Sequence, residues 1–93
     1  MEVSSGDPYT DFSLKNGDVL RLFRESVPEE DLVWHRDKEN RLIYVEDNMD
    51  WMIQFDNRLP EELKMGSEII IKEGEYHRLI KGSGSLVIRI KKL

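Results

Sequence analysis

Hydrophobic and polar residues alternate with a period of two along most of the chain after about residue 10. The alternating runs are short, rich in β-branched and aromatic residues, and separated by polar turns that often contain glycine. The pattern predicts strands over residues 19–24, 32–35, 41–45, 51–55, 69–71, 76–80 and 86–90. Short strands at this spacing are typical of an all-β sandwich or barrel.

Two proline-led segments, Pro28–Leu32 and Pro60–Met65, compete with this all-β interpretation. Each places acidic residues directly after proline, as the first turn of a helix does. Both are too short to form independent helices, so we predict turns between strands. Residues 1–10 hold little that could be buried and predict a loose tail, followed by a single domain over residues 11–93.

Composition and charge narrow the function classes. The chain has 93 residues, of which 39% are hydrophobic and 35% charged, as expected for one small globular domain. A net charge of −5 disfavours binding to nucleic acid or to an anionic membrane. The absence of cysteine excludes disulfides and a thiol nucleophile. No secretory signal pattern is visible at the N-terminus, so we expect a cytoplasmic protein.

The segment from Gly66 to His77 has a distinctive spacing. A glycine at 66, a second at 74 and the histidine at 77 fall on the positions of the second cupin motif, which this segment resembles. Lys72 stands where that family usually has proline.

The first cupin motif resembles a segment further upstream. His35 matches its first histidine, Asp37 stands at its second histidine, Arg41 at its glutamate and Asn48 at its glycine. The resemblance covers about residues 32–90. It implies the RmlC-like double-stranded β-helix, a small barrel of two antiparallel sheets.

The resemblance also implies a metal site. It would bring His35 and His77 into the barrel, and residues two apart on an extended segment share one face, which adds Asp37. Two imidazoles and one carboxylate are suited to a divalent metal such as Fe, Mn, Ni or Zn. These ligands do not identify the metal.

Arg41 supports an alternative, because a guanidinium cannot ligate a metal and would repel one. In that alternative, Arg41, Asp37 and His35 form a metal-free cluster, and the barrel binds a small anionic or sugar ligand without catalysis. Gln54 and Tyr44 are further candidates for ligand contact. Both hypotheses predict a small-molecule ligand, and neither decides whether the protein is an enzyme.

A homodimer is the expected assembly. A small domain with many strands exposes sheet edges, and pairing across a two-fold axis hides them. The cupin resemblance implies dimers as well. We expect the segment from Phe12 to Phe23 to cross between subunits.

Overall fold

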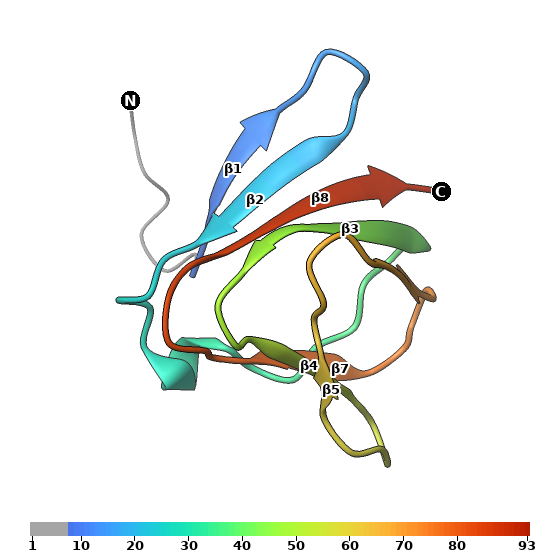
Figure 1. Ribbon diagram of the computed structural model, residues 1–93. Coiled ribbons are helices and arrows are strands. Elements are labelled where there is room, and N and C mark those ends of the chain that lie inside the picture. The colour runs from blue at the N-terminus through green and yellow to red at the C-terminus, as the bar shows by residue number, and fades with distance from the viewer. Residues whose placement is uncertain (1–7) are drawn as a thin grey trace.

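The computed structural model describes residues 8–93 and folds them into two facing antiparallel sheets (Figure 1). The larger sheet has the order β1 (Thr10–Ser13), β2 (Val19–Phe23), β8 (Leu86–Lys92), β3 (Arg41–Asn48) and β6 (Glu68–Ile71). The smaller sheet has the order β5 (Glu61–Glu62), β4 (Met52–Phe55) and β7 (His77–Ile80). The predicted all-β class with two antiparallel sheets is confirmed.

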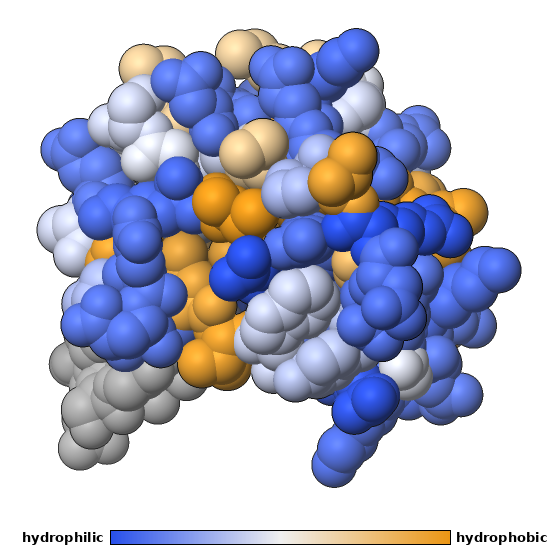
Figure 2. Space-filling view, turned by 90° about the horizontal axis from the view of Figure 1, so that it is seen from below, coloured by the Kyte–Doolittle hydropathy of each residue, from blue (hydrophilic) through white to orange (hydrophobic). Residues whose placement is uncertain are grey.

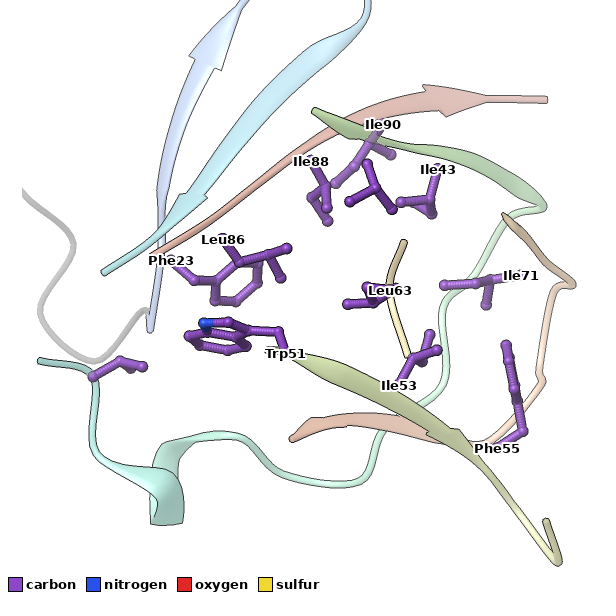
Figure 3. Close-up of a cluster of buried hydrophobic side chains, with 12 residues drawn as sticks. Phe23, Ile43, Trp51, Ile53, Phe55, Leu63, Ile71, Leu86, Ile88 and Ile90 are labelled. Carbon is purple, nitrogen blue, oxygen red and sulfur yellow. The ribbon is translucent and has the colours of Figure 1, made fainter. Parts of the chain in front are cut away.

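Side chains that alternate along the strands fill the space between the sheets. Ile43 on β3 and Ile88 on β8 point inward from the larger sheet, and Ile53 on β4 points toward them from the smaller one (Figure 3). Trp51 and Phe23 pack together toward one end, with ring centroids 5.5 Å apart. Burial of this apolar set is the main favourable term in folding, at about 25 cal/mol per Å² removed from water.

Two strand predictions need correction. Residues 32–35 do not form a strand, because only His35 pairs, through a single antiparallel bridge to His77. The strand predicted over residues 41–45 continues to Asn48, because a bulge between Val45 and Asp47 lets it keep pairing with β8. The strand β1 was not predicted, since Phe12 is its only large apolar residue and its ladder with β2 supplies the order.

The two proline-led segments are turns that contain short regular elements. A 3₁₀ helix, η1 (Glu29–Asp31), follows Pro28, and the two-residue strand β5 follows Pro60. The predicted tail lies largely outside residues 8–93, and Thr10 already belongs to β1. Within residues 8–93, no helix has the length and apolar character needed to span a bilayer. The homodimer and the cytoplasmic location stay predictions.

Candidate functional site

His35, Asp37 and His77 come together at one wall of the barrel interior. His35 Nε2 lies 3.7 Å from Asp37 Oδ1, and His77 Nε2 lies 3.5 Å from Asp37 Oδ2. One ligand atom from each of the three residues lies within 4.8 Å of the other two. His35 and Asp37 belong to the extended segment before β3, and His77 begins β7, so the juxtaposition that the cupin resemblance implied is present.

Backbone carbonyls orient both imidazoles. His77 Nδ1 lies 2.7 Å from the carbonyl oxygen of Glu75, and His35 Nδ1 lies 2.9 Å from that of Val33. A carbonyl only accepts hydrogen bonds, so each Nδ1 carries the proton and donates it. In the neutral ring the lone pair is then on Nε2, the atom that faces Asp37. Metal-ligating histidines are held in the same way.

Asp37 is a buried carboxylate with an unsatisfied oxygen. Its Oδ2 atom is inaccessible to solvent and has no hydrogen-bond partner among the described residues. The contacts to the two imidazoles exceed the 2.7–3.2 Å of ordinary hydrogen bonds. A buried carboxylate without partners is costly, so this atom needs a positive or donating group that no side chain of residues 8–93 provides.

Arg41 approaches the cluster but is held mainly by another residue. Its Nε donates to Glu39 Oε2 at 2.9 Å, whereas its Nη1 atom is 3.4 Å from Asp37 Oδ1. Although burial acts in the opposite direction, the hydrogen bond from Arg41 lowers the pKa of Glu39. Arg41 and His35 therefore both face Oδ1 of Asp37, whereas Oδ2 faces the imidazole of His77.

The buried histidine is biased toward its neutral form. Burial lowers the pKa of His77, and the neighbouring His35 lowers it further, although the carbonyl of Glu75 and the charge of Asp37 act in the opposite direction. The side chain of His77 is 4% exposed and that of His35 is 48% exposed. His77 is thus available as a neutral ligand at physiological pH.

The donor set fits a divalent ion. Ligand atoms that surround one ion at about 2.0–2.2 Å lie roughly 3 to 3.5 Å apart. His77 Nε2 lies 3.5 Å from Asp37 Oδ2, close to that spacing, and His35 Nε2 lies 3.7 Å from the other oxygen, Oδ1.

A cavity of about 360 Å³ adjoins the cluster. Both sheets contribute to its walls, which are formed chiefly by isoleucine side chains: Ile43, Ile53, Ile69, Ile71, Ile88 and Ile90. His35, Asp37, His77 and Arg41 line the same cavity. Figure 2, viewed from below, shows a mainly hydrophilic surface with apolar side chains visible between polar ones.

The structure does not bring Gln54 and Tyr44 to this cavity. Gln54 lies on the outer face of β4, where it donates to the carbonyl of Arg58 and accepts from Arg78. Tyr44 lies on the outer face of β3 beneath the guanidinium of Arg89, 4.0 Å from its ring centroid. Because Arg41 points inward, the residue three positions further along the strand points outward.

Two residues near the cluster were not predicted. Glu39 holds Arg41, and Arg21 on β2 lines the cavity. The sequence could have identified Arg21 as a cavity residue, because it stands between Val19 and Phe23 on the inward face of an otherwise apolar strand. Glu39 lies in a run of charged residues that gives no such signal.

Comparison with known proteins identifies the fold. No protein-family model and no curated protein matches the chain. A cupin-2 domain protein from Shewanella frigidimarina superimposes with a TM-score of 0.65 at 17% identity, over 91% of this chain and 79% of that one. The Fe(II) form of HppE in complex with substrate gives a TM-score of 0.64 at 15% identity, over 91% of this chain and 52% of that one.

A chain from the structures of the DMSP lyases RdDddP and RnDddQII gives a TM-score of 0.68 at 10% identity, over 88% of this chain. This chain spans only 44% of that lyase chain and about half of HppE. The low identities show the fold and not a shared activity. With two facing antiparallel sheets and these structural neighbours, the chain is a small protein of the cupin fold.

Proposed function

We propose that the chain binds one divalent transition-metal ion through His35, Asp37 and His77, beside a cavity that holds a small molecule. The observation that carries the proposal is the buried Oδ2 of Asp37, which has no hydrogen-bond partner among residues 8–93. An ion ligated by this oxygen and by the Nε2 atoms of both histidines would satisfy it.

The metal-free cluster explains these contacts less well. Without an ion, Asp37 would need a proton on His77 Nε2 or His35 Nε2, and neither atom is within hydrogen-bond distance. The burial of His77 opposes its protonation. Arg41 donates its Nε hydrogen bond to Glu39 rather than to Asp37, which reduces the charge that an ion would meet.

The three ligands define the kind of metal and the kind of chemistry. Two imidazoles and one carboxylate suit Fe, Mn, Co, Ni and Zn. When bound, such an ion supplies open coordination positions that can orient and polarise a small molecule. HppE has been crystallised in Fe(II) and Co(II) forms, which supports the choice of a transition metal for this fold. The chain's own residues would exclude water from the cavity and fix the two imidazoles.

Elemental analysis of tag-free protein, reconstituted separately with Fe, Mn, Co, Ni and Zn, tests the proposal. We expect near-stoichiometric metal in the wild type and its loss in Asp37→Asn, because a neutral amide is a poor ligand for these ions. Asp18→Asn is the matched control. Asp18 is equally buried, but it pairs with Arg89 at 2.9 Å, and neither residue lines the cavity.

The outcomes are distinct. Metal retained in Asp18→Asn and lost in Asp37→Asn supports the site. Wild-type protein that takes up none of the five metals, or an Asp37→Asn variant that holds metal as well as the wild type, would overturn it.

A further inference from the structure

We propose that the small molecule is a short aliphatic monocarboxylate, with its head group between the metal and Arg41 and its hydrocarbon part along the isoleucine walls. This inference rests on the proposed function, because the ion is one of the two partners of the head group. It names a substrate class for the cavity, which the fold alone does not.

The walls of the cavity favour a hydrocarbon. Six isoleucines together with Phe23, Leu63 and Leu79 line it, and among the described residues no Ser, Thr, Asn or Gln side chain does. A sugar buried there would lose hydrogen bonds from its hydroxyl groups to water and regain few, at a cost of roughly 1 to 3 kcal/mol for each group. An aliphatic chain incurs no such cost. The volume, about 360 Å³, is near the lower end for ligand pockets and favours a short chain.

Two arginines, Arg21 and Arg41, line the cavity, and their guanidinium groups differ in how they are paired. The guanidinium of Arg21 is already paired, because its Nε and Nη2 atoms donate to the two oxygens of Asp11 at 2.7 and 2.9 Å. The same guanidinium stacks on Tyr9 at 3.6 Å. Arg21 is therefore a paired, structural residue.

The terminal nitrogens of Arg41, in contrast, are not paired in this way. Within residues 8–93 its only side-chain hydrogen bond runs from Nε to Glu39, so its terminal nitrogens remain available beside Asp37. Its side chain is 19% exposed, which places these donors in a partly dry environment where a carboxylate is held more firmly than in water. A planar guanidinium matches a carboxylate in geometry.

The net charge of the site favours a ligand with one negative charge. A divalent ion, the carboxylate of Asp37 and the Arg41–Glu39 pair leave one net positive charge with both histidines neutral. The Arg21–Asp11 pair is internally neutral. Asp31 also lines the cavity, but it lies on the exposed η1 segment, where water screens its charge. A monoanion therefore neutralises the site.

Titration of the Co(II)-loaded protein with hexanoate tests this inference, with 1-hexanol as the uncharged probe of equal chain length. We expect hexanoate to perturb the visible Co(II) spectrum and to bind at least tenfold more tightly than 1-hexanol. Arg41→Met keeps the length of the side chain and removes the charge, so it should weaken hexanoate binding at least tenfold. Arg89→Met is the control, because Arg89 does not line the cavity and pairs with Asp18 and Glu46; it should change hexanoate affinity less than threefold.

Cobalt content is measured for every variant before titration, which separates the two proposals. If the wild type takes up no cobalt, calorimetric titration of the metal-free protein with hexanoate tests Arg41 alone, and the metal site is decided separately by the reconstitution with all five metals. Loss of hexanoate binding in Arg41→Met, with cobalt retained, supports the inference. Equal affinity for hexanoate in Arg41→Met and wild type, or 1-hexanol binding as tightly as hexanoate, would overturn it.

Discussion

The backbones of His35 and His77 exchange two hydrogen bonds, with the N–H of each residue donating to the carbonyl of the other at 2.9 and 3.0 Å. Residues directly opposite in an antiparallel bridge project their side chains to the same face. The centroids of the two imidazole rings consequently lie 4.3 Å apart, and both Nε2 atoms lie near the carboxylate of Asp37. A slip of one residue in this pairing would turn one imidazole away from the carboxylate.

Replacing His77 with asparagine should remove the metal and leave the backbone contact intact. The asparagine Nδ2 can still donate to the carbonyl of Glu75, as the imidazole Nδ1 does, but no ligand atom remains at the Nε2 position. We expect metal content to fall below one tenth of the wild-type value. The lost packing against Phe55 should lower the free energy of unfolding by about 1 to 2 kcal/mol.

His35→Asn is the comparison for this variant. His35 is half-exposed, so its replacement should weaken metal binding while changing the free energy of unfolding by less than about 0.5 kcal/mol. Urea denaturation in the presence of chelator measures stability, and elemental analysis measures the metal. Full metal content in either variant would remove that histidine from the site.

Without metal, Asp37→Asn should be at least as stable as the wild type. The substitution replaces a buried, unsatisfied carboxylate with a neutral amide of the same shape, which relieves the desolvation of a charge. Asp18→Asn should instead lose about 1 to 2 kcal/mol, because Asp18 accepts hydrogen bonds from Arg89 and Asn16. Thermal unfolding in chelator compares the two, and a marked loss of stability in Asp37→Asn would mean that the carboxylate is a structural partner of Arg41.

A close backbone contact makes Gly82 irreplaceable. A Cβ atom at this position would overlap the backbone oxygen of Met49, in the turn that also receives the indole hydrogen bond of Trp51 at Gly84. We expect Gly82→Ala to lower the free energy of unfolding by more than about 2 kcal/mol, since backbone must shift to admit the methyl group. Gly17→Ala meets no atom within 4 Å and has only the cost of a positive φ, about 1 kcal/mol. Equal losses in chemical denaturation would contradict this ranking.

The period-two pattern predicted most strands of both sheets, because burial on one face of a strand fixes the sequence alternation directly. The same rule shows why Arg41 and Tyr44 could not both contact a ligand in the cavity, since three positions along β3 separate opposite faces. The position of His77 opposite His35 followed from the resemblance and not from the alternation.

Other features depend on contacts that sequence patterns do not encode. The segment before β3 pairs with other strands at only one described position, the bridge between His35 and His77. Its path is set by this bridge and by a hydrogen bond from the backbone N–H of Gly74 to the carbonyl of Asp37. The role of Arg41 depends on Glu39, a partner that the sequence pattern does not indicate. The sequence predicted either repulsion of a metal or pairing with Asp37, whereas the shortest contact of Arg41 is with Glu39.

Because Arg41 still carries a positive charge near the ligands, its removal should tighten metal binding. At an effective dielectric constant of about 20, a unit charge several ångströms from a divalent ion costs a few kcal/mol, partly offset here by Glu39. We expect Arg41→Met to lower the dissociation constant for Zn²⁺ or Co²⁺ at least fivefold in competition with a chelator of known affinity. Arg21→Met, whose charge is already paired with Asp11, should change it less than twofold. Weaker metal binding in Arg41→Met would show that the arginine supports the ligands.

The stability of the metal-free protein should fall as the pH is lowered below about 6.5. Burial, aided by His35, holds the pKa of folded His77 below its ordinary value. At a pH between the folded-state pKa and the ordinary pKa of about 6.5, the unfolded chain therefore binds a proton that the folded chain does not. The contribution of His77 is therefore complete above pH 6.5 and is lost as the pH falls to its folded-state pKa. His77→Asn lacks this proton uptake, so the stability difference between wild type and variant should shrink between pH 7 and pH 5 in chelator-treated samples. A difference that stays constant over that range would show that the buried imidazole titrates like an exposed one.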